Sequence, residues 1–242
     1  MKTQCKLAGL PVAFMHESER VAQFFSDFVT AEHPTLTLSV TRAEIDAEYT
    51  AERPIADRAA LRADRGYGEA LALYRRFCHT LPTYGGFFLH AAFFTYRNHG
   101  VAVIAPSGVG KSTHVRLWRE AYPDEVRVIN GDKPLVRRTA DGDYLGYGAP
   151  LAGKEGWCEH TAAPITHLIF LTRGTEDTVA PLPPAEAFPS LFSAVLAPQD
   201  QQELSLLLPH ISNILQSART YRAAVTPSPM AVDAVRRAIL EG

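Results

Sequence analysis

Apolar residues recur along this chain with two spacings, an alternation typical of strands and a three- and four-residue spacing typical of helices. The short apolar runs predict strands over residues 7–15, 35–40, 87–96, 101–105, 126–130, 134–138, 144–147 and 167–172. The amphipathic segments predict helices over residues 41–52, 66–80, 110–121, 184–195, 201–218 and 230–241. Strands and helices that follow one another in this way indicate an α/β fold.

Local signals mark where some of these elements begin or turn. Thr41 and Glu44 have the spacing of a capping box, which places the start of a helix at Thr41. The segment Arg97–Gly100 and the pair Asp141–Gly142 each lie between two apolar runs, and their Asn, Asp and Gly residues favour tight turns. Both segments therefore predict β-hairpins.

The composition of the 242 residues is that of a globular protein, with 46% apolar and 21% charged residues. A net charge of −2 gives no electrostatic reason to expect nucleic acid or an anionic membrane as a partner. The three cysteines, Cys5, Cys78 and Cys158, are widely spaced, as is typical of reduced thiols. We find no apolar run long enough for a signal peptide or a membrane span, so we expect a cytoplasmic protein.

The length fits one large domain that carries a smaller lobe. We expect a small N-terminal α+β lobe over residues 1–82 and the main domain over residues 83–242. The main domain holds the segments in which chemistry can be recognised.

The segment Val101–Thr113 places an apolar strand, a glycine-containing loop and Gly-Lys-Ser-Thr in the order of a phosphate-binding P-loop. Glycines let backbone N–H groups approach phosphate oxygens, the lysine supplies a cation to the β- and γ-phosphates, and the serine hydroxyl is placed for Mg²⁺. The expected nucleotide-binding residues are Ser107, Gly108, Val109, Gly110, Lys111, Ser112 and Thr113. The P-loop pattern begins with glycine, where this chain has Ala105.

The residues around this loop narrow the family. His90 stands 21 positions before Lys111, on an apolar run that leads through a hairpin turn into the P-loop strand, and this arrangement resembles the catalytic domain of HPr kinase/phosphorylase. The segments 128–135 and 147–157 are similar to shorter HPr-kinase-related proteins that are described as phosphoenolpyruvate-carboxykinase-like. The resemblance covers about residues 87–173.

This resemblance implies a P-loop domain of the type shared by the HPr kinase C-terminal domain and phosphoenolpyruvate carboxykinase, with phosphoryl transfer onto a serine. The family carries two adjacent aspartates after a strand, one acting as base on the serine hydroxyl and the other helping to hold magnesium. This chain has Gly131-Asp132 there, so Asp132 matches the second aspartate and the first is missing. We therefore expect Ser112 and Asp132 as metal ligands, with ATP and Mg²⁺ as cofactors.

Four residues are candidates for the catalytic site: Asp132, His90, Lys154 and Arg173. Asp132 follows a strand, where a Walker-B-type aspartate contacts magnesium, although an Asx turn would also explain it. His90 would orient the phosphate or the carboxylate, or be a core histidine. Lys154 is bracketed by glycines and would reach the transferring phosphate, or be a solvated loop lysine. Arg173 ends a strand, where it would contact nucleotide or form a structural ion pair.

The function that these observations favour is a Mg-ATP-dependent kinase that transfers the γ-phosphate to a serine-type hydroxyl. Its partners would be the nucleotide and an acceptor that is a small protein, a peptide or free serine, and the sequence leaves a homo-oligomer open. One alternative is a non-catalytic ATP-binding regulatory module that has lost activity with the first aspartate. Another is a phosphoenolpyruvate-carboxykinase-like enzyme, which would need a larger substrate lobe.

Overall fold

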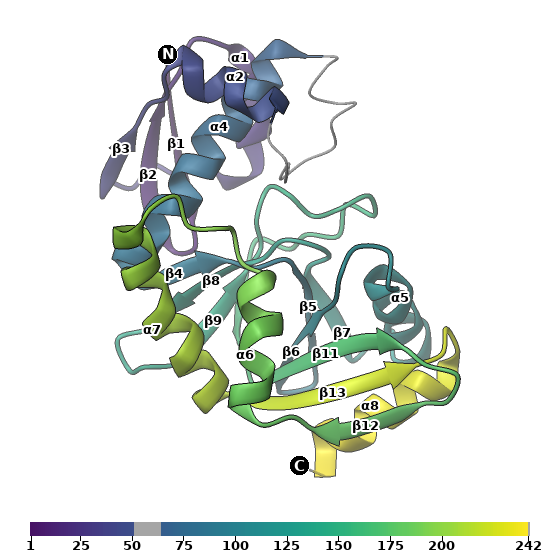
Figure 1. Ribbon diagram of the computed structural model, residues 1–242. Coiled ribbons are helices and arrows are strands. Elements are labelled where there is room, and N and C mark those ends of the chain that lie inside the picture. The colour runs from purple at the N-terminus through teal and green to yellow at the C-terminus, as the bar shows by residue number, and fades with distance from the viewer. Residues whose placement is uncertain (51–63, 242) are drawn as a thin grey trace. The chain divides into compact units, whose positions relative to one another are not determined.

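The computed structural model describes residues 1–50 and 64–241, and the chain forms two compact units, Met1–Leu81 and Pro82–Gly242 (Figure 1). Both units contain helices together with strands, so the fold is mixed α/β, as the sequence predicted. The short 3-10 helix η2 (Leu81–Tyr84) contains the boundary between them.

The first unit is a three-stranded sheet with helices packed on it. Its elements are β1 (Lys2–Leu7), β2 (Leu10–Met15), α1 (Glu19–Phe24), the 3-10 helix η1 (Ser26–Phe28), β3 (Leu36–Leu38), α2 (Arg42–Thr50) and α4 (Arg65–Thr80). The strand order is β1-β2-β3, with β1 and β2 antiparallel and β2 and β3 parallel. The strand predicted over residues 35–40 is confirmed in shortened form as β3.

The single strand predicted over residues 7–15 is wrong. Ala8 and Gly9 have φ values of 50° and 72°, and this pair forms a two-residue turn that separates β1 from β2. Backbone in this left-handed region is typical of the turns that join two antiparallel strands. Strand β1 was not predicted because its buried side consists of Thr3, Cys5 and Leu7, which alternate with lysine and glutamine and give only a weak apolar pattern.

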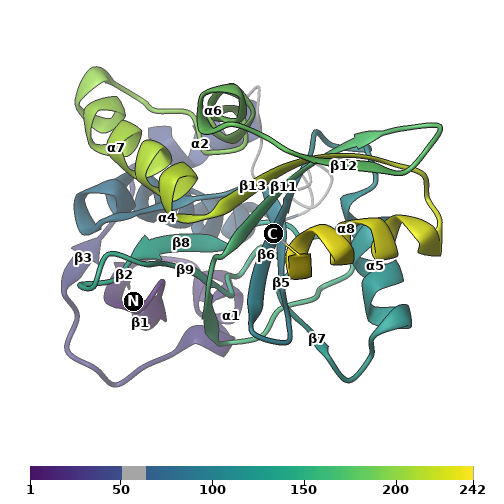
Figure 2. The same ribbon diagram turned by 90° about the horizontal axis from the view of Figure 1, so that it is seen from below.

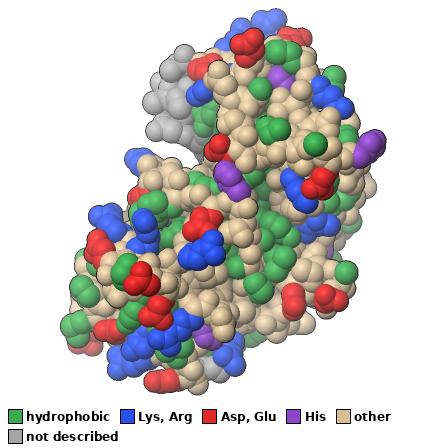
Figure 3. Space-filling view, turned by 180° about the vertical axis from the view of Figure 1, so that it is seen from behind, with side chains coloured by type: hydrophobic (Ala, Val, Ile, Leu, Met, Phe, Trp, Pro, Cys, Tyr) green, Lys and Arg blue, Asp and Glu red, His purple; other side chains and the backbone are tan. Residues whose placement is uncertain are grey.

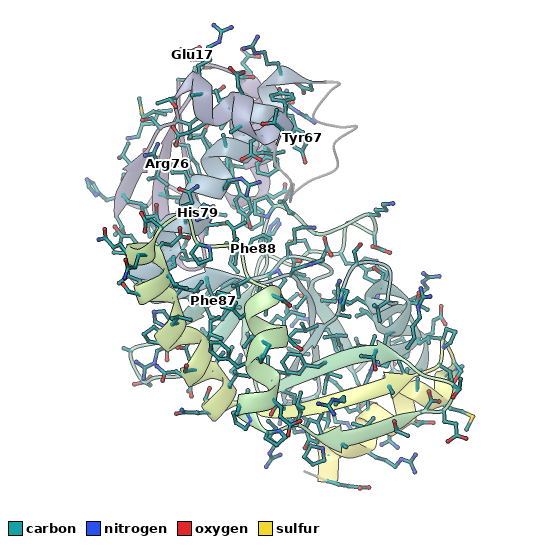
Figure 4. All side chains as sticks on the ribbon, viewed as in Figure 1. Glu17, Tyr67, Arg76, His79, Phe87 and Phe88 are labelled. Atoms are coloured by element: carbon teal, nitrogen blue, oxygen red, sulfur yellow. The ribbon has the colours of Figure 1, made fainter. Side chains whose placement is uncertain are left out.

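The helix predictions in this unit agree with the structure where it describes them. The capping box is confirmed, because the Thr41 amide donates to Glu44 Oε2 at 2.8 Å and the Glu44 amide donates to Thr41 Oγ1 at 3.3 Å. Residues 51–52 of the predicted helix lie outside the described residues. The helix predicted over residues 66–80 is confirmed as α4, and its Arg76 (Figure 4) donates to Glu44 at 2.8 Å, which holds α2 against α4.

The second unit contains two sheets and four longer helices. Its elements are β4 (Gly86–Phe88), β5 (Ala91–Tyr96), β6 (His99–Ile104), α5 (Lys111–Ala121), β7 (Val126–Asn130), β8 (Leu135–Arg138), β9 (Tyr144–Tyr147), β10 (Ala162–Pro164), β11 (His167–Arg173), β12 (Thr178–Pro181), α6 (Pro184–Ser193), α7 (Gln201–Ser217), β13 (Arg219–Val225) and α8 (Pro229–Glu241). Each predicted helix of this part of the chain is confirmed to within a few residues.

The larger sheet has the strand order β12-β13-β11-β6-β5-β7 and carries helices on both faces (Figure 2). Alternate residues of β5 point to opposite faces, as a pleated strand requires. Ala92 and Phe94 pack in a core with α5 and α8, whereas Ala91 and Phe93 pack in a core with α6 and α7. Burial on both faces explains why these strands read as continuous apolar runs.

The strand predicted over residues 87–96 is two strands in different sheets. Phe87 and Phe88 (Figure 4) lie on β4, which pairs with β8 in a four-stranded antiparallel sheet of order β10-β9-β8-β4. The chain turns at Leu89 and His90 before β5 joins the six-stranded sheet. His90 therefore lies at a break between strands, not within one.

Both predicted hairpins are confirmed, as β5–β6 and as β8–β9. In the first hairpin the residue with positive φ is Arg97, at 52°, and not Asn98. Strands β10, β12 and β13 were not predicted, although β13 is buried between β11 and β12.

The distribution of charged side chains and the character of the helices can be compared with what the sequence led us to expect. On the face drawn in Figure 3, acidic and basic side chains are interspersed rather than separated by sign. Among the described residues, no helix combines the length and the apolar character that crossing a membrane demands.

Candidate functional site

The topology of the six-stranded sheet brings four loop segments to one edge. Strands β6 and β11 are parallel, and β7 runs in the same direction because both β6 and β7 are antiparallel to β5. The carboxyl ends of β6, β7 and β11 therefore meet the amino end of β5. This edge holds the residues that follow Ile104, Asn130 and Arg173, together with His90, which precedes β5.

The loop between β6 and α5 (residues 105–110, the β6–α5 loop) is open to an approaching anion. Gly108 and Gly110 have φ values of 80° and 125°, and a Cβ placed at either glycine would meet no described atom within 4 Å. No described side chain caps helix α5 at Gly110. The N–H groups of the first turn, which contains Lys111, Ser112 and Thr113, are therefore left for an anion to satisfy.

Lys111 is the first residue of α5, and only 7% of its surface is exposed. Its ammonium donates to the carbonyl of Ala105 at 2.9 Å and lies 3.2 Å from His90 Nε2. Burial lowers the pKa of Lys111, Asp132 opposes that shift, and Lys133 adds to it. Lys111 thus lies against the start of the β6–α5 loop, with its ammonium beside His90 and Asp132.

His90 Nε2 also lies 3.3 Å from Asp132 Oδ1, so one ring nitrogen faces both Lys111 and Asp132. A neutral ring nitrogen either donates a proton or accepts one, and it cannot do both. We assign the proton to Nε2, because donation satisfies the carboxylate while Lys111 keeps its bond to Ala105. The main chain at His90 is held by a bond from the His90 amide to the Ala194 carbonyl at 2.7 Å.

Asp132 lies in a turn that Asn130 organises. Asn130 is fully buried, and its Oδ1 accepts from the amides of Asp132 at 3.0 Å and Lys133 at 2.6 Å. Its Nδ2 donates to the carbonyls of Ala149 at 3.1 Å and Leu151 at 3.3 Å. Asn130 therefore joins the turn that presents Asp132 to the segment 149–151.

Both oxygens of Asp132 face cationic or donor groups. His90 lies at Oδ1, and the ammonium of Lys133 is paired with Oδ2. Burial would raise the pKa of the Asp132 carboxyl, but His90 and Lys133 together hold that pKa well below its usual range. Asp132 is consequently ionised at neutral pH.

The loop of residues 148–157 passes beside this turn. Lys154 is exposed in it and lies next to Gly153, where an added Cβ would be 2.9 Å from Asp132 Cβ. The structure thus brings the backbone of this loop to Asp132, but among the described residues the Lys154 side chain makes no hydrogen bond or ion pair with the other candidates. Trp157 packs against the core, with the Arg119 guanidinium 4.9 Å from the centre of its ring.

Arg173 contacts the β6–α5 loop itself. Its guanidinium donates to the carbonyl of Gly108 at 2.5 Å and approaches the carbonyl of Val109 at 3.4 Å. Both partners are backbone carbonyls, and among the described residues Arg173 forms no ion pair. Arg173 holds the loop through its carbonyls, which directs loop N–H groups away from the guanidinium.

Sequence reasoning missed Lys133 and underrated Asn130. Lys133 follows Asp132 directly, where a lysine usually reads as a solvated residue, and only the fold shows its pairing. Asn130 was not among the candidate residues, although its position at the end of a buried strand is a signal for a side chain that bonds to the backbone. Within the described ranges, no three His, Cys, Asp or Glu side chains gather as a metal ion held by protein alone would need.

Comparisons with known proteins add little to this geometry. No protein-family model matches the chain, and no curated protein matches its sequence. Among solved structures, the HPr(Ser) kinase/phosphatase from Coxiella burnetii is similar over 64% of this chain and 91% of that chain, with 11% sequence identity and a TM-score of 0.37. At this level the likeness does not decide a function.

Proposed function

We propose that this chain binds ATP with Mg²⁺ at the β6–α5 loop and transfers the γ-phosphate to a serine-type hydroxyl. The acceptor would be a small protein, a peptide or free serine. The observation that carries the proposal is the convergence of Lys111, His90 and Asp132 beside an open glycine loop and an uncapped helix. The resemblance of residues 87–173 to HPr-kinase-type sequences supports the same reaction.

The described residues fit a bound triphosphate. The two glycines leave space for phosphate oxygens next to the backbone, and the uncapped first turn of α5 offers N–H groups and the positive end of the helix dipole. Lys111 and Lys133 bring two positive charges against the single carboxylate of Asp132. The lysines would balance the charge of an anion bound here, and its oxygens would accept hydrogen bonds from the N–H groups.

The residues also fit a magnesium ion that is shared with the nucleotide. Mg²⁺ prefers oxygen ligands and is usually held by one or two protein groups together with phosphates and water. The Ser112 hydroxyl and the ionised Asp132 would be the protein ligands. A cluster of several carboxylates, which the described residues lack, is not required for such a site.

The remaining candidates would act on the transferred group. Phosphoryl transfer depends mainly on positioning and on cations that stabilise the equatorial oxygens. Lys111 would hold the phosphates, His90 would orient Asp132, and Lys154 would reach the phosphate from its loop. Arg173 would keep the β6–α5 loop in the shape that binds the nucleotide.

One observation favours a second candidate function, a nucleotide-binding module without catalysis. Gly131 stands where HPr-kinase-type sequences have their first aspartate, so a base at that position is missing. Nucleotide binding needs only the loop, Lys111 and the metal ligands, and it would survive this loss.

Phosphate transfer from γ-labelled ATP separates the two candidates. The protein is incubated with Mg²⁺ and either free serine, a serine-bearing peptide or a small serine-bearing protein, and label in the acceptor is measured against a reaction without acceptor. The proposal predicts magnesium-dependent label in at least one acceptor class. Binding of Mg-ATP by calorimetry without any transfer would support the module instead.

A further inference from the structure

A second carboxylate, that of Glu155, lies on the loop that borders Gly131 and Asp132. Gly131 does not adopt positive φ, so its backbone would tolerate a side chain. The space for a side chain is narrow, because a Cβ at Gly131 would lie 3.0 Å from the Ala152 carbonyl oxygen, a tight contact, and 3.4 Å from Trp157 Cβ, an ordinary one. The segment 152–157 therefore borders the place where the side chain of an aspartate at residue 131 would begin.

This segment is fixed to the end of β7 rather than merely close to it. The Gly131 amide donates to the Trp157 carbonyl at 2.8 Å, and the Glu159 amide donates to the Ile129 carbonyl at 3.0 Å. Gly153 and Gly156 have φ values of 77° and 65°, and the Gly156 amide donates to the Gly153 carbonyl at 3.3 Å. These bonds close a tight turn that presents Lys154 and Glu155 at its tip.

The turn places the Glu155 carboxylate on the side of Asp132. A Cβ at Gly153 would lie 3.4 Å from Asp132 Cγ and 3.5 Å from Glu155 Oε2, so both carboxyl groups lie around one point beside Gly153. Glu155 is exposed, and among the described residues it has no hydrogen bond or ion pair. Asp132, in contrast, is engaged at both oxygens by His90 and Lys133.

We propose that Glu155 is the general base of the transfer reaction and supplies the carboxylate that is missing at Gly131. This inference rests on the proposed kinase function. In the step, the acceptor hydroxyl gives its proton to Glu155, its oxygen forms the new bond to the γ-phosphorus, and the bond between that phosphorus and the bridging oxygen breaks to release ADP. Asp132 keeps its role as metal ligand, so the two functions of the aspartate pair are divided between two segments.

The substitution Glu155→Gln tests this role, because it keeps the shape of the side chain and removes its basicity. General-base catalysis typically contributes about 10²- to 10⁴-fold, so we expect transfer to fall by at least ~10². Mg-ATP affinity, measured by calorimetry, should stay within about twofold, because Glu155 is not one of the residues proposed to bind the nucleotide or the metal. Glu155→Asp, which keeps a shorter carboxylate, should retain more transfer than Glu155→Gln.

The matched control is Glu159→Gln, which removes a carboxylate four residues away that is paired with Arg127 on the surface. It should leave both transfer and binding unchanged. A Glu155→Gln protein that transfers phosphate at the parent rate would overturn the assignment, and so would one in which the loss of transfer follows an equal loss of Mg-ATP binding. Both results leave the proposed kinase function standing, whereas a parent protein that transfers to no acceptor would overturn both.

Discussion

Replacing Asn130 by alanine tests whether the site is built as described. Asn130 is fully buried and makes four hydrogen bonds, two to the amides of Asp132 and Lys133 and two to the carbonyls of Ala149 and Leu151. A typical buried bond contributes about 1 kcal/mol net, and a partner left unsatisfied costs about 1–3 kcal/mol. The loss of all four should therefore lower the free energy of unfolding by about 3–5 kcal/mol.

This loss is large enough to measure by thermal unfolding followed by circular dichroism. A change of 1 kcal/mol shifts the melting temperature by about 2–4 °C in a domain of this size, so we expect a decrease of roughly 10 °C. The control is Asn98→Ala at the exposed tip of the β5–β6 hairpin, which should change stability by less than about 0.5 kcal/mol.

Nucleotide binding is a second property to measure in the Asn130→Ala variant. Because Asn130 joins the Asp132 turn to the segment 149–151, its loss should weaken Mg-ATP binding as well as stability. An Asn130→Ala protein that melts within about 2 °C of the parent would show that these four bonds do not hold the turn, and the reasoning from buried polar satisfaction would fail.

Two further predictions concern the metal ligand and a buried histidine. Asp132→Asn should reduce phosphate transfer by at least about 10² and weaken Mg-ATP binding without abolishing it, and an unchanged transfer rate would place the metal elsewhere. Burial lowers the pKa of His114 from 6.5 to about 4. Between pH 6.5 and pH 4 the unfolded chain therefore binds a proton at this histidine that the folded protein does not bind. The free energy of unfolding consequently decreases as the pH falls through this range. The contribution of this one group is at most about 3 kcal/mol, and burial lowers the pKa of His167 similarly, to about 4. His114→Gln, which keeps an acceptor for Trp118, should make the loss of stability over this range less steep in urea titrations, and an unchanged slope would contradict the assignment.

The sequence predicted the helices well because their signals are local. The Thr41–Glu44 capping box and the amphipathic spacing of α4 depend only on residues within a few positions of each other. The loop that precedes Lys111 was predicted for the same reason, since the glycines and the lysine are adjacent in the chain.

The strands were harder, because distant pairing decides where they begin and end. Residues 87–96 are apolar almost throughout, and nothing local marks the break at Leu89 and His90, which arises because β4 pairs with β8 while β5 pairs with β6 and β7. Strand β13 contains arginines and alanines with a weak alternation, and its position between β11 and β12 is what makes it a strand.

In the candidate site, too, some relations between residues could be predicted from the sequence, whereas others depend on the fold. The spacing of 21 residues suggested that His90 and Lys111 belong to one site, and in the structure His90 Nε2 lies 3.2 Å from Lys111 Nζ. The pairing of Lys133 with Asp132 and the placement of Glu155 beside Gly153 depend on how the loop of residues 148–157 folds back on β7, which no local pattern encodes.

Binding of Mg-ATP to the parent and to Lys111→Met tests the central claim most directly. Methionine keeps most of the buried stem of the lysine and removes its charge, so the fold should survive. We expect calorimetry to detect Mg-ATP binding only in the parent, and a hundredfold excess over Kd to stabilise the parent alone by about 2.7 kcal/mol in thermal unfolding. A folded Lys111→Met protein that binds Mg-ATP as tightly as the parent would contradict the assignment of the β6–α5 loop as the nucleotide site.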